Sequence, residues 1–480
     1  MKSKKAPGQN KIQIELYKSA ITNNICLEKI TTALNNTLQN NEIPSNWCSS
    51  ITKLIPKNKN PTVKDYRPIA LTDNSYKICM GILKHKIEQH LKNNNLDNCH
   101  QFGFTTQRRT TDSAYILSYL IEHSYRRKEM LIITSIDFKK AFDSVKRDKL
   151  LEVMKKYKIH SKVIDLIINV YKNDTTKLIK NNQAIDDIEI YSGIRQGCNG
   201  STVLFLMITY LIIEEITKLN VGIRMGNVNL NALFFADDGL LMTNSIYDAQ
   251  ITINRLEEVG SLCGLNLNKE KSFHIININK NDITEINNIK VVKSIKYLGI
   301  TVNEGRNCFN EHKKAKIKKA KELASMIMSV IAKSTNKILI GKTYWKIVAL
   351  SESLYGAEIV LFNKSEINEI KRAENLAYRH ILETPRFTPN CALRSEIGSS
   401  YMESRDQTIK LKFMKHILTS ENKSLKEIAQ LDFTNKTTKF CKITQKYMDQ
   451  LNINKNQLIA RTDQQIKDTV TKKDTERWSI

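Results

Sequence analysis

Three carboxylates close or interrupt apolar runs of the sequence, and they are the strongest candidates for chemistry. Asp137 closes a β-branched run at 131–136, and Asp237 and Asp238 separate two apolar runs at 231–236 and 240–243. Acids at the ends of buried strands are costly unless a cation compensates their charge. Two Mg²⁺ ions about 4 Å apart would do so, and would stabilise the attacking and leaving oxygens of an in-line phosphoryl displacement.

Magnesium binds through a few carboxylates together with substrate phosphates, which suits three acids without a neighbouring histidine. The sequence therefore predicts a site for two Mg²⁺ ions, with Mn²⁺ as an alternative, whose ligands are Asp137, Asp237 and Asp238. A second interpretation stays open for the last two acids, because Asp-Asp-Gly between apolar runs is also typical of a plain hairpin turn.

The composition restricts the class of protein around these acids. The 480 residues include 75 basic and 49 acidic side chains, a net charge of +26, which favours phosphate-bearing partners. With 41% hydrophobic and 26% charged residues the chain has enough apolar side chains to fold. Nine scattered cysteines without a CxxC pair suit a reducing, intracellular compartment, in the nucleus or the cytoplasm. The longest apolar run, 203–213, is too short to cross a bilayer, so no membrane partner is expected.

Hydrophobic spacing predicts the elements that position the acids. Strand-like runs at 51–55 and 68–71 flank a basic loop at 57–65, and 131–136 is predicted to be a buried strand that ends at Asp137. The runs around 237–239 predict a hairpin. Helical spacing is found at 11–40, 74–92, 141–158, 203–216 and almost throughout the sequence beyond residue 302.

This pattern divides the chain into a mixed and a helical part. We predict an N-terminal helical segment at 1–36, an α+β region at 37–302 and an all-helical region at 303–480. Residues 303–480 hold 33 basic and 20 acidic side chains, whereas residues 1–302 hold 42 and 29. Each part therefore carries a net charge of +13, and the shorter helical region has more positive charge per residue.

Seven segments in order decide the function: LIPKNKNPTVKDYRPIAL at 54–71, QFGF at 101–104, SIDFKKAFDSV at 135–145, GIRQGC at 193–198, FFADD at 234–238, GLNLNKEKS at 264–272 and YLGI at 297–300. This series resembles the reverse transcriptase domain of non-LTR (LINE-type) retrotransposons. The resemblance runs from KAPG at 5–8 to residue 302. The segments YGAE at 355–358 and ILETPRFTP at 381–389 also resemble that family's region after the palm.

The resemblance implies a right-hand polymerase, with α+β fingers and palm built on an antiparallel sheet and followed by an all-helical thumb and C-terminal extension. The implied reaction adds dNTPs to a primer 3′ hydroxyl on an RNA template by two-metal phosphoryl transfer. The implied partners are an RNA template, a DNA primer and dNTPs, and any protein partner stays unknown. Asp137 and Asp237 match the family's metal-binding catalytic aspartates, with Asp238 as the third acid, in agreement with the metal argument.

Further positions match substrate-binding motifs of the family. Lys57 and Arg67 match the fingers residues that hold the triphosphate, a role that suits the bidentate contacts of a guanidinium, although a solvated basic loop is the alternative. Phe142 matches the aromatic residue that excludes a ribose 2′-hydroxyl, although a core aromatic would look the same. Arg195, Gln196 and Gly197 match the element that lies against the templating base pair.

The remaining matches concern the leaving group and the nucleic acid. Lys271 matches a lysine proposed as general acid toward pyrophosphate, and Lys269 competes with it. Tyr297, Leu298 and Gly299 match the turn that grips the primer end, and Gln101 in QFGF is placed among the nucleic-acid contacts. Six lysines at 313, 314, 316, 318, 319 and 321 lie on one predicted helix. We expect Lys313, Lys314, Lys316 and Lys318 to contact template or primer phosphates, rather than to form an ordinary solvated face.

The chain departs from the family after its RQGC motif. The family usually has prolines where this chain has Asn199 and Thr202. We expect a less rigid loop before helix 203–216, with Ser201 or Thr202 as its cap. A catalytically decayed or domesticated copy that only binds nucleic acid is therefore the alternative function. No zinc-binding cysteines follow the helical region, so we expect this chain to lack its endonuclease and to be a fragment or a truncated copy.

Overall fold

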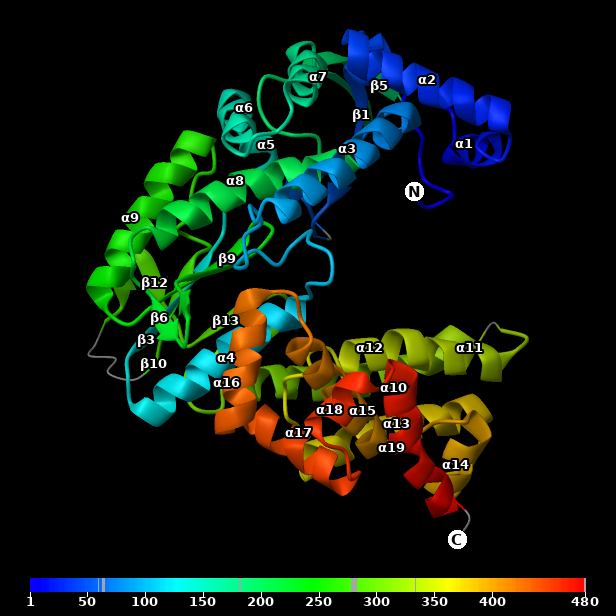
Figure 1. Cartoon of the computed structure of the whole chain (residues 1–480). Coiled ribbons are helices and arrows are strands. Elements are labelled where there is room, and N and C mark those ends of the chain that lie inside the picture. The colour runs from blue at the N-terminus through cyan, green and yellow to red at the C-terminus, as the bar shows by residue number, and fades with distance from the viewer. Residues whose placement is uncertain (59, 63–64, 181–182, 278–282, 333, 479–480) are drawn as a thin grey trace. The chain divides into compact units, whose positions relative to one another are not determined.

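The computed structural model describes residues 1–480 except 59, 63–64, 181–182, 278–282, 333 and 479–480 (Figure 1). The chain folds into two compact units, each assembled from three segments. Unit 1 comprises residues 1–104, 136–220 and 251–271, and unit 2 comprises residues 105–135, 221–250 and 272–480. The mixed α+β class with an all-helical C-terminal region is confirmed. The three-part domain division stays a prediction.

Unit 1 is built around a four-stranded sheet, with helices before, between and after its strands in the sequence. Its elements are α1 (Ile14–Ala20), α2 (Asn24–Asn40), η1 (Ser45–Trp47), β1 (Ser49–Pro56), β2 (Tyr66–Leu71), α3 (Asn74–Asn93), α5 (Ala141–Ser144), α6 (Arg147–Lys156), α7 (Ser161–Lys172), β4 (Thr175–Lys180), β5 (Gln183–Glu189) and α8 (Asn199–Thr217). The strand order is β2-β1-β4-β5. β1 pairs antiparallel with β2 and parallel with β4, which confirms the predicted strand pair around the basic loop.

The helix predicted at 141–158 is two helices, α5 and α6, separated at Val145 and Lys146. Both residues use their backbone groups elsewhere. The Val145 carbonyl accepts a hydrogen bond from the Gly193 amide over 2.8 Å, and the Lys146 amide donates to the Cys263 carbonyl over 2.9 Å. These long-range bonds take the place of helical ones, and hydrophobic spacing gives no signal of them.

Helix α8 begins four residues earlier than predicted, so the expectation of a flexible loop at 199–202 is wrong. Its N-cap is Cys198, and neither Ser201 nor Thr202 caps it. The Thr202 hydroxyl donates to the Asn199 carbonyl over 2.8 Å, inside the first turn. By length and hydropathy α8 would suffice to cross a membrane, but 72% of its most apolar window is buried inside the protein, as in the core helix of a globular domain.

Unit 2 combines a second sheet with the C-terminal helices. Its strands are β3 (Leu131–Ile136, whose last residue is counted in unit 1), β6 (Ile223–Met225), β7 (Val228–Leu230), β8 (Ala232–Phe235), β9 (Asp238–Thr243), β10 (Phe273–Asn277), β11 (Glu285–Ile286), β12 (Ile289–Val291), β13 (Ser294–Tyr297) and β14 (Ile300–Asn303). The main sheet has the order β11-β12-β10-β3-β9-β8. β3 is thus an interior strand, in line with its buried β-branched run.

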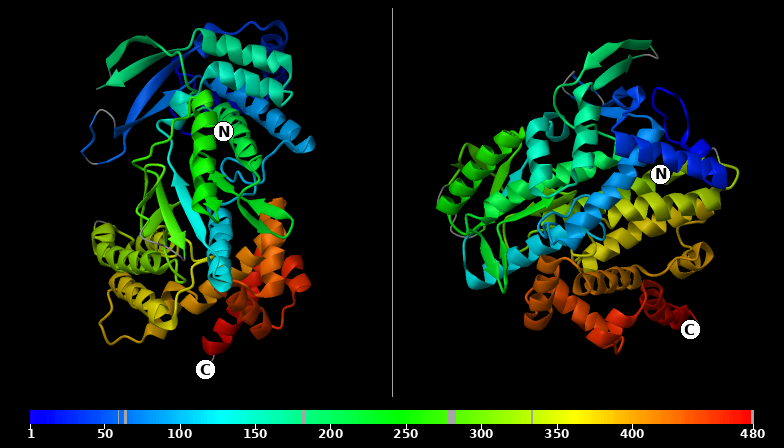
Figure 2. Two further views of the ribbon diagram at one scale, coloured as in Figure 1. Left: turned by 90° about the vertical axis from the view of Figure 1, so that its left-hand side faces the viewer. Right: turned by 45° about the horizontal axis from the view of Figure 1, so that its top comes forward.

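The helices of unit 2 are α4 (Thr110–Arg127), α10 (Asn310–Ile331), α11 (Lys337–Tyr344), the π-helical turn η3 (Trp345–Ala349), α12 (Leu350–Ser353), α13 (Lys364–Leu382), α14 (Asn390–Ile397), α15 (Met402–Leu418), α16 (Lys423–Asn435), α17 (Lys439–Gln450), α18 (Lys455–Ala460) and α19 (Asp463–Trp478). Helix α9 (Ile246–Cys263) passes from unit 2 to unit 1. Figure 2 shows that α10–α19, coloured from yellow-green to red, gather into one helical mass, which agrees with the predicted helical region.

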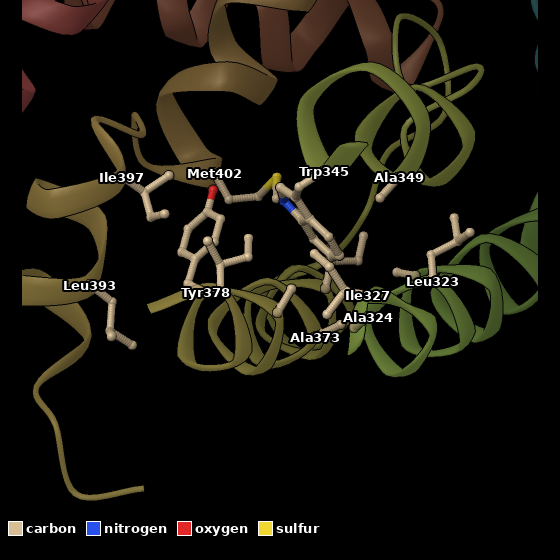
Figure 3. Close-up of a cluster of buried hydrophobic side chains, with 14 of the residues drawn as sticks. Leu323, Ala324, Ile327, Trp345, Ala349, Ala373, Tyr378, Leu393, Ile397 and Met402 are labelled. Atoms are coloured by element: carbon tan, nitrogen blue, oxygen red, sulfur yellow. The ribbon is translucent and has the colours of Figure 1, made fainter. Parts of the chain in front are cut away.

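The C-terminal helices share a buried core in unit 2. Trp345 and Tyr378 pack edge to face at its centre, with ring centroids 6.2 Å apart, and Ile327, Ala373 and Met402 surround them (Figure 3). The Glu374 carboxylate is also buried here and pairs with Arg394 and Arg405. A smaller cluster of Ile132, Ala249, Ile276 and Ile286 contains residues of β3 and β10.

Candidate active site

The Asp237–Asp238 pair lies at a hairpin, but not as the sequence predicted. Phe235 pairs with Asp238, so the turn consists of Ala236 and Asp237, and Asp238 already belongs to β9. Ala236 has φ +58°, the left-handed conformation that such two-residue turns require and that a non-glycine residue adopts at a cost. Gly239 lies inside β9, and a glycine is required because a Cβ there would come within 2.6 Å of the Phe234 ring. Asp237 is half-buried and Asp238 exposed.

Asp137 directly follows β3, as predicted, and its side chain is oriented by Asn268. The Asn268 side-chain amide donates to Asp137 Oδ2 over 2.8 Å, and the Asn268 backbone amide donates to the Asp137 carbonyl over 2.8 Å. The bridge between Phe138 and Leu267 joins the same two segments. The GLNLNKEKS motif contains Asn268 but predicts no role for it, and in the structure Asn268 fixes the half-buried carboxylate.

The three acids fit divalent cations by donor chemistry, since carboxylate oxygens are the ligands that Mg²⁺ prefers. Among the residues that the structure describes, no group of three or more His, Cys, Asp or Glu residues forms a metal cluster by itself. Mg²⁺ usually keeps several waters and binds through one or two carboxylates plus substrate phosphates. The carboxylate oxygens of the three acids therefore suit an ion that is also bound by a substrate phosphate.

Lys57 and Arg67 share one face of the β1–β2 hairpin. Arg67 pairs with Ile55, and Lys57 is two residues beyond Ile55, so the side chains of Lys57 and Arg67 leave the sheet on the same side. The Lys57 amide extends the ladder by donating to the Asp65 carbonyl over 2.8 Å. Both side chains are exposed. The structure thus brings together two cations that a triphosphate could bridge.

Phe142 is part of an aromatic cluster in unit 1. Its ring stacks on Phe205 with centroids 4.4 Å apart and an interplanar angle of 12°, and it meets Phe104 edge to face at 6.1 Å. The Phe142 carbonyl accepts a hydrogen bond from the Ile194 amide over 2.9 Å. The ring is half-buried, so it is fixed by its neighbours and keeps an accessible part.

The segment 195–197 divides into a buried and an accessible part. Arg195 is buried with Asp174, to which Nη2 is 2.7 Å distant, and its Nη1 donates to the Trp47 carbonyl over 2.6 Å. The rings of Tyr76 and Tyr171 flank the guanidinium, with their centroids 5.2 and 5.8 Å from Arg195 Cζ. Burial opposes the charged form of Arg195, but Tyr76 and Asp174 outweigh it and raise its pKa. The expectation that Arg195 contacts substrate is therefore corrected: its side chain is used inside the protein.

Gln196 and Gly197 join this segment to the β1–β2 hairpin. The Ala70 amide donates to the Gln196 carbonyl over 2.7 Å, and Gln196 Nε2 donates to Asp143 Oδ1 over 3.1 Å. Gly197 has φ +103°, and a Cβ there would lie 3.1 Å from the Ala70 carbonyl oxygen, so glycine is required. Burial raises the pKa of Asp143, while Gln196, Lys140 and Lys57 lower it. The motif at 135–145 contains Asp143 but predicts no role for it, and in the structure it accepts a hydrogen bond from the matched residue Gln196.

The two competing lysines of the GLNLNKEKS motif differ in their surroundings. Lys269 forms an ion pair with Glu257 over 2.9 Å. Lys271 is exposed and forms no ion pair with the described residues of the chain. The free ammonium group of Lys271 therefore suits a general acid better than that of Lys269.

Gln101 is a second correction, because its side chain is buried completely. Its Nε2 donates to Thr209 Oγ1 over 3.0 Å, and its Oε1 accepts from the Gly103 amide over 2.9 Å. Direct contact with nucleic acid is closed to such a side chain. Gln101 instead ties the loop before α4 to helix α8.

The YLG turn connects β13 and β14, and its first residue is buried. Burial raises the pKa of the Tyr297 hydroxyl, and the charge of Asp238 raises it further. The Tyr355 hydroxyl donates to the Leu298 carbonyl over 2.7 Å, and the Tyr355 ring packs on Gly299. Tyr355 lies in YGAE, so the structure joins two quoted segments in unit 2. The proposed primer grip stays a prediction, for which the half-buried Leu298 and the exposed Gly299 are accessible.

The six lysines lie on α10, as expected, but several meet acids that local sequence does not reveal. Lys313 pairs with Glu366 at 3.0 Å and Lys321 with Glu369 at 2.6 Å, both on α13. Lys316 is 3.9 Å from Glu352 on α12, and Lys319 is 3.8 Å from Glu322 on its own helix. Lys314 and Lys318 are exposed and have no ion pair among the described residues. These two are the free phosphate-binding candidates of the helix.

The sequence of the chain is similar to those of known proteins. A model of the family described as "Reverse transcriptase (RNA-dependent DNA polymerase)" matches residues 55–302, just over half of the chain. The chain is 25% identical over 240 residues to the retrovirus-related Pol polyprotein of the type-2 retrotransposable element R2DM of Drosophila melanogaster. It is 28% identical over 233 residues to that of the type-1 element R2 of Nasonia vitripennis. Each match covers 48% of the chain and 22% of the relative, so the chain spans about a fifth of these relatives.

A solved structure of apo telomerase from Candida tropicalis aligns with 93% of the chain and 74% of its own length, at 12% identity and a TM-score of 0.43.

Proposed function

Because the chain belongs to the reverse transcriptase (RNA-dependent DNA polymerase) family and is similar to non-LTR retrotransposon Pol polyproteins, we propose that it adds dNTPs to a DNA primer 3′ hydroxyl on an RNA template. The observation that carries this proposal is the placement of the acids. Asp137 follows β3, Asp237 and Asp238 lie at the β8–β9 hairpin, and β3 and β9 are neighbours in one sheet.

The three acids would hold two divalent cations, Mg²⁺ above all, and such ions when bound neutralise the charge of the reacting phosphate. The protein's part is to fix the carboxylates. Asn268 orients Asp137 by two hydrogen bonds, and the strained Ala236 turn presents Asp237 at the tip of the hairpin. These local restraints on Asp137 and Asp237 support an in-line displacement, because oriented ligands lower the cost of binding the ions and the substrate.

The substrate side is built from unit 1. Lys57 and Arg67 would hold the triphosphate from one face of the β1–β2 hairpin, and the Phe142 ring, backed by Phe205, would leave no room for a 2′-hydroxyl. Gln196 and Gly197 would lie against the templating pair, held by Ala70 and Asp143. Lys271 would donate a proton to the pyrophosphate oxygen, because its exposed amine has no ion pair among the described residues, whereas Lys269 pairs with Glu257.

The nucleic acid would be held by the exposed lysines of α10, principally Lys314 and Lys318, through its phosphates. An RNA template and a DNA primer are the proposed partners. The expectation that this chain has no endonuclease activity stays a prediction, and relaxation of a supercoiled plasmid with Mg²⁺ would contradict it.

The experiment extends a labelled DNA primer, annealed to an RNA template, with dNTPs and Mg²⁺. We expect products up to the template end, and Lys271→Ala to slow extension more than Lys269→Ala does. Tight binding of primer and template by the wild type without any extension would overturn the proposal and favour the decayed, binding-only copy.

A further inference from the structure

A polar cavity of about 620 Å³ lies within unit 2, and none of the matched polymerase residues lines it. Residues of helix α4, the first residue of β3, the β6–β7 hairpin and helix α16 line it. Its floor is buried and includes Tyr119, Leu120 and Met225. Its rim is exposed and includes Arg224 and Asn435. An apolar floor with a polar rim is the usual construction of a small-ligand site, and the volume is in the usual range.

One face of α4 supplies an aromatic wall. Tyr119, His123 and Arg127 are spaced four residues apart, so they line the same side of the helix. The rings of Tyr119 and His123 stack, with centroids 5.9 Å apart and an interplanar angle of 30°. Burial, together with the charge of Arg127, lowers the pKa of His123, so its ring is neutral at neutral pH. Tyr119 thus fixes one face of an uncharged imidazole that lines the cavity.

Four polar side chains converge on this cavity without using their hydrogen-bonding groups inside the described protein: His123, Arg224, Asn244 and Asn435. Arg127 differs, because it pairs with Glu129 over 2.7 Å, and both are exposed. Arg224 is therefore the cation of the lining that no acid neutralises. Convergent polar groups that lack protein partners are available to a ligand that enters the cavity.

We propose that this cavity binds a nucleotide unit. The imidazole of His123 offers a planar surface on which a base can stack, as aromatic side chains do in nucleic-acid sites. The amides of Asn244 and Asn435 offer both donors and acceptors to a base edge or a ribose, and the guanidinium of Arg224 offers bidentate contact to a phosphate. Two guanidinium groups against the single carboxylate Glu129 leave the lining cationic, which favours a phosphate over a neutral ligand. The unit is either a free nucleotide or one residue of an RNA strand.

The test uses the full chain with Asp237→Ala, so that the measurement is independent of polymerisation. The first probe is AMP carrying a fluorescent methylanthraniloyl group, followed by anisotropy. The second is a short single-stranded RNA with one photoreactive 4-thiouridine, whose crosslink is mapped by peptide mass. Each is repeated with Arg224→Ala and with Arg306→Ala, a control that removes one exposed arginine of unit 2 outside the cavity.

A free-nucleotide site predicts saturable AMP binding that Arg224→Ala weakens about tenfold, the loss of one charge-assisted contact, while Arg306→Ala changes it less than twofold. An RNA site predicts no AMP binding but a crosslink in the peptides of α4 or the β6–β7 hairpin, which Arg224→Ala removes. Absence of both signals, or an equal effect of Arg306→Ala, overturns the proposal. Primer extension by Arg224→Ala with wild-type Asp237 should be unchanged. Failure of the wild type to extend would reject the polymerase proposal without touching this result.

Discussion

Gln196 Nε2 donates a hydrogen bond to Asp143 Oδ1 over 3.1 Å, so the segment that is proposed to face the templating pair is tied to the helical turn that carries Phe142. The Ile194 amide adds a bond to the Phe142 carbonyl over 2.9 Å. The two motifs that are proposed to face the substrate are therefore joined by hydrogen bonds within unit 1. A substitution in one motif should change the position of the other.

We expect Asp143→Ala and Gln196→Ala each to raise the KM for dNTPs in primer extension. Because the two side chains act as a pair, the free energy of dNTP binding lost in the double variant should be about 1 kcal/mol smaller than the sum of the two single losses. This difference corresponds to roughly fivefold in KM. Asp143→Asn keeps an acceptor oxygen for Gln196 and should restore most of the affinity. Additive effects, or a loss with Asp143→Asn as large as with alanine, would contradict the coupling. Asp165→Ala removes an exposed acid of unit 1 and serves as control.

The stability of the protein should depend on pH through the same carboxyl. Burial raises the pKa of Asp143 above its ordinary value of 3.8, so the folded state disfavours its ionised form. This contribution to stability is complete below the unfolded pKa and is lost as the pH rises through the folded pKa. Asp143→Asn lacks this penalty, so its free energy of unfolding relative to the wild type should increase as the pH rises from 3.8 toward neutrality. Urea unfolding at several pH values measures it, and a constant difference would contradict it.

Phe142 should set the choice between dNTPs and rNTPs. Replacement by valine removes most of the ring from above the sugar site, so the ratio of kcat/KM for dNTP over rNTP should fall at least about tenfold. If the ring served only the core with Phe205, the variant would lower the free energy of unfolding and reduce both substrates alike. Measuring both substrates together with thermal unfolding separates the two outcomes.

Template binding should weaken most when the free lysines of α10 are removed. The double variant Lys314→Ala with Lys318→Ala should lower the slope of log affinity against log salt by about 2, since each phosphate contact contributes about 0.9. Lys313→Ala with Lys321→Ala is the matched control, because Glu366 and Glu369 already neutralise those cations. An equal reduction in both double variants would contradict the distinction.

Much of the fold follows from local patterns. The β-branched run before Asp137 is the strand β3, and the helical spacing at 74–92 is α3 with its end one residue later. The two-residue period of strands and the 3.6-residue period of helices indicate which side chains are buried, and this is enough to predict long elements. The break between α5 and α6 and the early start of α8 depend on tertiary hydrogen bonds and packing, which no local period contains.

The sequence predicts which residues belong to the candidate site, but not which side chains they contact. The motifs identify Arg195 and Gln101 as positions of interest, yet their side chains are buried against Asp174, Trp47 and Thr209. These partners lie far away in sequence, so local patterns do not reveal the burial. The same reason hid the acids that pair with the α10 lysines. Asp143 and Asn268 were within quoted motifs, and only the contact geometry gives them a role.

The central claim is that Asp137, Asp237 and Asp238 carry out the chemistry, and the rate of single-nucleotide addition to a primed RNA template tests it most directly. Asp237→Asn keeps the size of the side chain but removes the charge, so we expect the rate to fall on the order of a hundredfold or more, with template affinity unchanged. Asp165→Asn, which removes an exposed acid, should leave the rate unchanged. A rate for Asp237→Asn within about twofold of the wild type would contradict the account.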